Sequence, residues 1–378
     1  MDLRAALSPY VDSGEIPGLV ALVTRGDEVV VEALGVQGTS GVPMARDSIV
    51  RGASITKPLT AALVMVLVEE GVLSLDEPVS GLLPELSSPR VLRTLGSGLD
   101  DTVPADRPIT LRHLLTSTAG HGFATWDSPV VPLLMEELRQ ASDDIHEVPA
   151  PDEWMRRLSA IPLMHQPGEG WTYNAAYDVL GVLISRAAGH DLADVMAERL
   201  LAPLGMHDTG FHVPAADRGR FTTLYGGGER GLEVRDEPDG VFTRRPAFAS
   251  GSGGLVTTVD DWLAFGRMLL ADGGSLLSPG SVRLMTTDQI TAQHREMGGF
   301  FLDGQGWGFG GGVDTALIDP WNELGRYGWV GGTGTSAYVH PASGTVAVLL
   351  TQVELGAPGI EDLLKAFWTA TVGLSTDS

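Results

Sequence analysis

The sequence predicts an α/β fold in which an antiparallel sheet flanked by helices is built from both ends of the chain. Val-rich strand-like runs lie near both termini, and residues from Leu75 to about Gly240 show helices joined by long loops. At 378 residues the chain is long for a single core. We therefore expect a discontinuous α/β domain (1–74 and 241–378), an inserted mostly helical domain (75–240), and an active site in the cleft between them.

The first part of the chain predicts a helix, a hairpin and a second helix. An amphipathic pattern over 3–13 ends near Gly14 and Pro17. Two Val-rich runs, 19–24 and 29–34, flank Arg25-Gly26-Asp27-Glu28, which is typical of a hairpin turn. A buried helix is expected to begin at Ser54 and to continue through the apolar run to Glu70.

The inserted region and the C-terminal part are predicted from the same periodicities. Helices are expected at 111–118, 151–161, 174–188 and 192–201, with surface loops at 87–110 and 137–153. In the C-terminal part we expect strands at 251–256, 307–313, 336–340 and 345–352, and helices at 259–270 and 360–371.

Composition excludes several functional classes. The net charge of −23 argues against nucleic acid and anionic membranes as partners, because both attract positive surfaces. The absence of cysteine excludes disulfides, thiolate metal sites and a cysteine nucleophile. The longest apolar run, 61–68, is far shorter than the roughly 20 residues that span a bilayer. The N-terminus lacks an apolar segment followed by a cleavage site, so we expect no signal peptide and a cytoplasmic protein.

The pair Ser54 and Lys57 is the first candidate for chemistry. Residues three apart share a helix face, so the two side chains can converge on one point. A serine hydroxyl needs a base to become a good nucleophile, and a desolvated lysine amine can serve as that base. Lys57 and Lys365 are the two lysines of the chain. A capping serine beside a solvated lysine is the alternative interpretation.

Two later segments supply candidate partners. Tyr173 precedes a predicted helix, and beside a protonated lysine its pKa is expected to fall so that it can relay a proton. The alternative is a packing tyrosine with a hydrated hydroxyl. The stretch Tyr327 to Ser336 is rich in glycine, which lets the backbone approach a ligand, although such a stretch is more often a simple turn.

Taken together, Ser54-Ile55-Thr56-Lys57, Tyr173-Asn174-Ala175 and Trp329-Val330-Gly331 resemble the three motifs of the serine β-lactamase and penicillin-binding-protein superfamily. The chain is most similar to the family VIII carboxylesterases, which are related to class C β-lactamases. The resemblance covers almost the whole chain and includes the framework stretches 109–116, 203–206 and 251–258.

The resemblance implies the β-lactamase/DD-peptidase-like fold and a set of roles. Ser54 is the acylated nucleophile, with Lys57 and Tyr173 as the general-base pair. The backbone N–H groups of Ser54 and Gly332 form the oxyanion hole. Substrate contacts are expected from Trp329, which lines the acyl or alcohol pocket, and from Gly331 and Asn174. No metal or organic cofactor is needed.

Two departures from the family pattern narrow the expected substrates. β-Lactamases and DD-peptidases have Lys or His where this chain has Trp329, and that cation holds the substrate carboxylate. They usually place Asn two residues after the motif tyrosine, whereas here Ala175 stands at that position and Asn174 one earlier. Both changes favour neutral esters over peptide-like acids.

Other motifs carry less weight. The nine histidines show no His-Glu-x-x-His spacing, so no metal site is predicted, and His113, His121 and His165 are expected to be packing residues near the cleft. Gly-x-Gly-x-x-Gly occurs at 226–231 and 306–311 outside any βαβ unit. The acidic pairs Asp260-Asp261 and Asp143-Asp144 are interpreted as helix caps and solvated surface.

The sequence thus predicts a serine hydrolase acting through an acyl-enzyme on short-chain or aryl esters, with a small-molecule ester as its partner. Three alternatives stay open at this point: a β-lactamase or D-aminopeptidase-type amide hydrolase, an acyltransferase using the same Ser-Lys-Tyr site, and a non-catalytic binding protein on this fold. The oligomeric state is not predicted.

Overall fold

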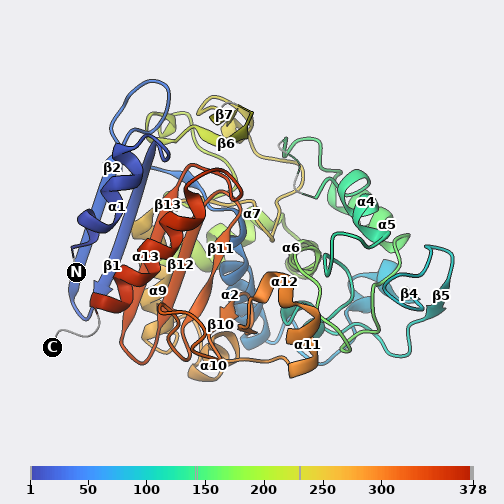
Figure 1. Cartoon of the computed structure of the whole chain (residues 1–378). Helices are drawn as coiled ribbons and strands as arrows, with labels where there is room; N and C mark the ends of the chain where they lie inside the picture. Colours follow the sequence, from blue (N-terminus) through green and yellow to red (C-terminus); the bar gives the residue numbers. More distant parts are fainter. Residues whose placement is uncertain (1, 141, 143, 230, 375–378) are drawn as a thin grey trace.

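A computed structural model describes residues 2–140, 142, 144–229 and 231–374. Seven strands form one antiparallel sheet in the order β2-β1-β13-β12-β11-β10-β9. Their bounds are β1 Gly18–Arg25, β2 Glu28–Gly35, β9 Gly306–Trp307, β10 Gly312–Val313, β11 Tyr327–Gly331, β12 Thr335–His340 and β13 Thr345–Thr351. Because β1 pairs with β13, strands from the two ends of the chain lie side by side in one sheet, as the blue and red strands of Figure 1 show. The predicted fold class is confirmed.

Most helices lie in the sequence between β2 and β9. The helical segments are α1 Leu3–Asp12, η1 Ala53–Ile55, α2 Thr56–Glu69, η2 Val79–Gly81, η3 Pro84–Leu86, α3 Leu111–Leu115, α4 Val130–Glu136, α5 Pro151–Ser159, α6 Ala175–Ala188, α7 Leu192–Met196, η4 Ala197–Leu201, α8 Ala202–Leu204, η5 Arg218–Arg220, η6 Val241–Thr243, α9 Val259–Leu270, α10 Pro279–Thr286, α11 Ala292–Met297, α12 Gly299–Leu302 and α13 Ile360–Leu374. Three small two-stranded sheets pair β3 Val50–Arg51 with β8 Val256–Thr257, β4 Arg90–Leu92 with β5 Thr102–Pro104, and β6 Leu224–Gly228 with β7 Gly231–Asp236.

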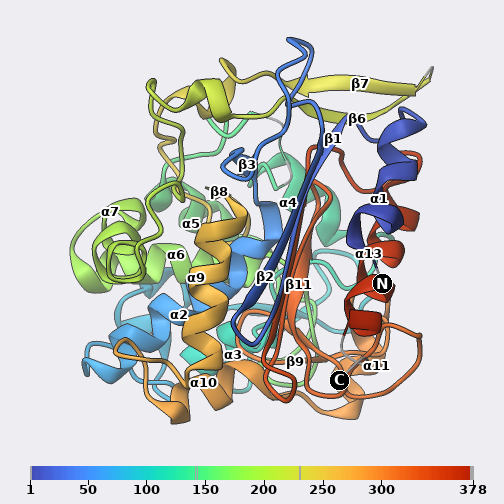
Figure 2. The same ribbon diagram turned by 90° about the vertical axis from the view of Figure 1, so that its left-hand side faces the viewer.

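Both faces of the large sheet are covered by helices, with α1 and α13 on one side and α2 and α9 on the other (Figure 2). Successive side chains of a strand point to opposite faces. Accordingly Leu19 and Ala21 pack in the core beneath α1 and α13, while Val20 and Leu22 belong to the larger core on the other side. This explains why β1 is apolar from Leu19 to Val23 instead of alternating with polar residues.

Helix α2 lies in the middle of the larger core. Its residues are buried from Thr56 to Leu67, which is typical of a helix enclosed on all sides. The larger core is continuous and includes residues of the sheet and of the helices between β3 and β8. The domain boundaries at 74 and 240 therefore stay a prediction.

Several predicted elements differ from the structure. In the predicted strand 251–256, residues 251–253 form a turn, and only Val256 pairs, as part of β8. The predicted strand 307–313 is split into β9 and β10 by a turn. The surface loop 87–110 contains the hairpin β4–β5, and residues 327–331 form a full strand of the sheet.

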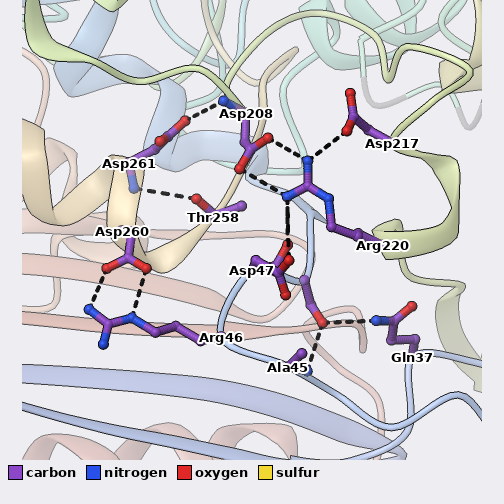
Figure 3. Close-up of polar contacts among 11 residues, drawn as sticks. Gln37, Ala45, Arg46, Asp47, Asp208, Asp217, Arg220, Thr258, Asp260 and Asp261 are labelled. Carbon is purple, nitrogen blue, oxygen red and sulfur yellow. Dashed lines mark hydrogen bonds and ion pairs between the residues drawn. The ribbon is translucent and has the colours of Figure 1, made fainter.

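The acidic pair at the start of α9 also differs from its prediction (Figure 3). Thr258, not an aspartate, caps α9 by accepting a hydrogen bond from Asp261 N–H. The Asp261 carboxylate is buried and accepts hydrogen bonds from Asp208 N–H and from the Thr209 hydroxyl, so it ties α9 to a neighbouring loop. Asp260 forms an exposed ion pair with Arg46. Asp143 lies outside the described residues.

In the described part of the chain, every helix is too short or too polar to cross a membrane.

Candidate active site

Ser54 and Lys57 meet at the start of the enclosed helix. Ser54 lies in η1 and Lys57 in the first turn of α2, and the Lys57 Nζ donates a hydrogen bond of 2.9 Å to the Ser54 Oγ. Lys57 is fully buried, while Ser54 is partly exposed. The alternative of a capping serine beside a solvated lysine is therefore wrong, since the Ser54 side chain caps no helix and the ammonium group has no access to water.

The Lys57 amine has two further partners. Its Nζ donates to the Asn174 Oδ1 at 2.9 Å and to the backbone carbonyl oxygen of Ser252 at 2.7 Å. Burial lowers the pKa of Lys57 to about 7, although the negative charge of Asp178 opposes this shift. A lysine with this pKa is largely neutral just above neutral pH, and a neutral amine can accept the proton of a serine hydroxyl.

Tyr173 faces the same hydroxyl from the turn before α6. Its ring centroid lies 4.5 Å from the Lys57 Nζ, and its hydroxyl forms hydrogen bonds with Ser54 and with the Trp329 indole N–H, the latter 2.7 Å long. Burial raises the pKa of the Tyr173 phenol to about 12, even though both hydrogen bonds pull it down. The prediction of a lowered tyrosine pKa was wrong, because it assumed that Lys57 is protonated and ignored the burial of the phenol.

Asn174 occupies a γ-turn. Its φ of 84° and ψ of −71° are unusual for a residue other than glycine, and Ala175 N–H bonds back to the Tyr173 carbonyl at 3.3 Å. The turn directs its side-chain oxygen to Lys57, while its Nδ2 donates to the Gln140 Oε1 at 2.5 Å. Asn174 thus lies at the site although the sequence places it one position early, and its amide is already used to hold Lys57. Its predicted contact with substrate stays a prediction.

The end of β11 lies directly against the Ser54 turn. A Cβ on Gly331 would lie 2.4 Å from the Gly52 carbonyl oxygen, so only glycine allows this approach. The Gly331 carbonyl accepts a hydrogen bond from Gly334 N–H. In a trans peptide the C=O and N–H groups point in opposite directions, so the Gly332 N–H points away from Gly334. Gly332 itself is exposed.

The Ser54 N–H is the other backbone donor of the predicted oxyanion hole. It lies among the first N–H groups of a helical segment, which lack partners within the helix. Ala53, immediately before it, has a φ of 46°, a strained conformation that is typical of functional sites. These backbone positions fit the predicted roles of Ser54 and Gly332, which stay predictions.

Aromatic rings pack around Tyr173. Trp329 is almost fully buried and touches Tyr173 at a ring-centroid distance of 5.7 Å. Phe301 stacks on Tyr173 at 4.6 Å and also contacts Phe300 and Trp126, of which 67% and 53% are exposed. We refer to Trp126, Phe300 and Phe301 as the aromatic rim. It leads from the Tyr173 ring to the molecular surface.

Three histidines were predicted to be packing residues near the cleft. His113 completes a capping box with Thr110 at the start of α3. Burial lowers the pKa of His121 to about 3 and that of His165 to about 4, so both are neutral at physiological pH. Within the described residues, no group of three or more His, Asp or Glu side chains could hold a metal ion.

The sequence did not reveal three contacts of the site. Trp329 was expected to line a pocket, but nothing predicted its hydrogen bond to Tyr173. Gln140 was placed in a surface loop and yet is buried against Asn174. Ser252 was placed on a strand, and its turn instead presents a carbonyl to Lys57. The framework stretch 251–258 was the available signal for Ser252, whereas Gln140 had none.

Comparison with known proteins shows the family of the chain. Residues 3–366 match the model of the Beta-lactamase family. A relative from Mycobacterium tuberculosis, Protein Rv1367c, is 37% identical over 364 residues, which cover 92% of this chain and 89% of the relative. Esterase EstB from Burkholderia gladioli is 33% identical over 376 residues, with 92% of this chain and 89% of EstB covered. The solved structure of EstCE1, described as a hydrolase with promiscuous acyltransferase activity, superposes with a TM-score of 0.80 at 26% identity, covering 97% of both chains.

Proposed function

The chain belongs to the β-lactamase family, and from this premise we propose that it is a serine carboxylesterase that acts through an acyl-enzyme on short-chain or aryl esters. The observation that carries the proposal is the 2.9 Å contact between the Ser54 hydroxyl and a fully buried lysine whose pKa is about 7. This contact provides a nucleophile and its base at neutral pH.

In the proposed reaction, neutral Lys57 takes the proton of Ser54 while the Oγ attacks the ester carbonyl carbon. The N–H groups of Ser54 and Gly332 stabilise the negative charge that develops on the carbonyl oxygen. Tyr173, whose hydroxyl contacts Ser54, then relays this proton to the departing alcohol. Water attacks the acyl-enzyme with the same groups acting in reverse and releases the acid.

Tyr173 is assigned to proton relay and positioning, not to the role of an ionised base. Its raised pKa keeps the phenol protonated at physiological pH, and Trp329 donates a hydrogen bond to its oxygen, which leaves the phenol proton free for Ser54 or the leaving group.

Two features support esters over β-lactams. The motif position at which the resemblance places a cation in β-lactamases holds Trp329, whose indole is engaged with Tyr173. The similarity to Esterase EstB also favours ester chemistry. A purified enzyme is expected to hydrolyse p-nitrophenyl acetate and butyrate much faster than nitrocefin. Faster nitrocefin turnover would move the assignment to amide hydrolysis.

The pH dependence of the reaction follows from Lys57. Below pH 7 its amine is protonated and cannot act as a base, so kcat/KM should fall about tenfold per pH unit below pH 6 and level off above about pH 8. Initial rates from pH 5 to 9 measure this, with the Ser54→Ala protein subtracted as the blank. An acid limb centred near pH 10, the range of an ordinary lysine, would contradict the assignment of Lys57 as base.

The aromatic rim supports an aryl or other bulky apolar group in the substrate, because exposed apolar rings beside a reactive centre usually bind ligand. Phe300→Ala should lower kcat/KM for 2-naphthyl acetate by about 3- to 10-fold, the worth of one aromatic contact, and leave ethyl acetate nearly unchanged. Val72→Ala is the matched control, since Val72 is also exposed but follows the far end of α2. Equal losses on both esters would contradict a role in aryl recognition.

Acyl transfer is the second candidate function. It is favoured by the similarity to EstCE1, which combines hydrolysis with acyltransferase activity. The same acyl-enzyme can be intercepted by an alcohol when water is excluded. Product analysis of p-nitrophenyl butyrate turnover with and without added alcohol separates the two functions, since a new ester as the main product assigns the protein as an acyltransferase.

A further inference from the structure

Asp178 is a buried carboxylate on α6 with no part in the mechanism above. It is 2% exposed and lies one helical turn beyond the Asn174 γ-turn. Four hydrogen bonds reach it: its Oδ1 accepts from the Ser250 hydroxyl at 2.7 Å and from Ser252 N–H at 3.2 Å, and its Oδ2 accepts from the Gln140 amide at 2.7 Å and from the Ser252 hydroxyl at 3.0 Å. All four donors are neutral, so none of them compensates the charge of the carboxylate.

Two short routes connect this carboxylate to Lys57. In the first, Gln140 donates to Asp178 and accepts from Asn174, and Asn174 in turn accepts from the Lys57 Nζ. In the second, Ser252 donates its N–H and hydroxyl to Asp178 while its carbonyl accepts from the same Nζ. Both acceptors of Lys57, apart from Ser54, are thus held in place by Asp178.

We propose that Asp178 is a positioning residue of the acylation centre, which holds the two acceptors of Lys57 and stabilises the positive charge that Lys57 gains when it takes the Ser54 proton. The inference rests on the proposed function, because it concerns the same proton transfer. The proton moves from the Ser54 Oγ to the Lys57 Nζ, so one charge appears on the amine, and Asp178 provides the opposite charge across the network.

The other groups packed around Lys57 are neutral, so we assign the compensating negative charge to Asp178. Tyr173 has a pKa raised to about 12 and is neutral, and the turn at Ser250 and Ser252 carries only hydroxyl and backbone groups. Trp329, from β11, is also uncharged. The charge of Asp178 raises the pKa of Lys57 against the larger effect of burial, as expected for a carboxylate that favours the ammonium form.

The test uses the chain's two lysines. With 13C-labelled lysine, the full-length protein gives one signal set for Lys57 and one for Lys365, which is exposed on α13 and serves as an internal reference. Asp178→Asn keeps the shape and removes the charge. We expect the Lys57 pKa to fall by about one unit or more, with Lys365 unchanged. The acid limb of kcat/KM should move to lower pH by the same amount, and its plateau should fall about tenfold or more because the ammonium form loses its stabilising charge.

Two further variants make the result decisive. Asp178→Ser, a smaller neutral residue that admits water to the four donors, replaces Asp178→Asn if the latter does not fold, and carries the same expectation. Asp261→Asn is the matched control, since Asp261 is also a buried aspartate that accepts bonds from a hydroxyl and an N–H, but on α9. It should leave the Lys57 signal unmoved.

An unchanged Lys57 pKa in the Asp178 variants, whatever happens to the rate, overturns the proposal and assigns Asp178 to fold stability alone. A shifted Lys57 pKa with an unmoved pH–rate profile supports the electrostatic link and contradicts Lys57 as the general base, which is a failure of the proposed function. Parallel shifts support both.

Discussion

Replacing Ser54 with alanine should abolish esterase activity, with a loss in kcat/KM on the order of 10⁴-fold or more, because the proposed acyl-enzyme forms on the Ser54 hydroxyl. The fold should be retained. Ser54 is partly exposed and its side chain caps no helix, so the change removes a hydroxyl without opening a cavity in the core. Turnover of p-nitrophenyl butyrate and the thermal unfolding midpoint measure the two effects.

A suitable control for this experiment is Ser159→Ala at the end of α5, where the hydroxyl is exposed and donates to the backbone carbonyl of Arg156. This variant should keep full activity and should still be labelled by a fluorophosphonate, whereas Ser54→Ala should not be labelled. Esterase activity that persists in purified Ser54→Ala protein would falsify the assigned nucleophile.

Replacing Lys57 with methionine should reduce kcat/KM by about 10³-fold or more, since removing either the nucleophile or its base disables the unit they form. It should also change how stability depends on pH. The pKa of Lys57 is about 7 in the folded protein and near 10.5 when unfolded, so between these values the unfolded chain binds more protons and folding becomes more favourable as pH rises. Below pH 7 both states are protonated, and the full cost of burying the charge is present.

Urea unfolding of both proteins at pH 7.5 and pH 9.5 tests this consequence. The free energy of unfolding of the wild type should gain about 2 to 3 kcal/mol relative to Lys57→Met over this interval, at about 1.4 kcal/mol per pH unit. Lys57→Arg provides a second comparison, because a buried guanidinium stays charged. It should be inactive and the least stable of the three. A constant difference between wild type and Lys57→Met across this range would show that Lys57 titrates normally.

The sequence contained enough to predict the fold class and the meeting of the site residues. Val-rich runs at both ends indicated a sheet shared by the termini, and β1 and β13 do pair. Ser54 and Lys57 were close in sequence at helical spacing, so their contact follows from helix geometry alone. Tyr173 depended on the resemblance, since no local pattern links it to a lysine that lies 116 positions earlier in the sequence.

The parts that could not be predicted are mostly long-range polar contacts. Asp178 lies within the apolar pattern of α6, between buried Tyr177 and Val179, and nothing in that pattern shows which polar groups it will meet. Residues 251–256 were predicted to form a strand. Residues 251–253 instead form a turn, and Ser250 and Ser252 bond to Asp178 there. Prediction from local sequence patterns fails here, because such patterns do not show the long-range hydrogen bonds of the site.

The direction of the Tyr173 pKa was missed for a related reason. A sequence shows that a lysine and a tyrosine are neighbours, but it does not show how deeply each is buried. In the structure burial outweighs their mutual influence. It lowers the pKa of Lys57, so the amine loses its proton more easily, and it raises the pKa of Tyr173, so the phenol stays protonated. The base and the relay are therefore distinct groups.

Mass spectrometry of the trapped acyl-enzyme tests the central claim most directly. p-Nitrophenyl pivalate carries a hindered acyl group, which should acylate the serine and leave slowly, so acid quenching during turnover preserves the adduct. Peptide mapping should then find one pivaloyl group, on Ser54, and none in the Lys57→Met protein. Release of p-nitrophenol with the acyl group on another residue, or on no residue at all, would contradict an acyl-enzyme formed at Ser54.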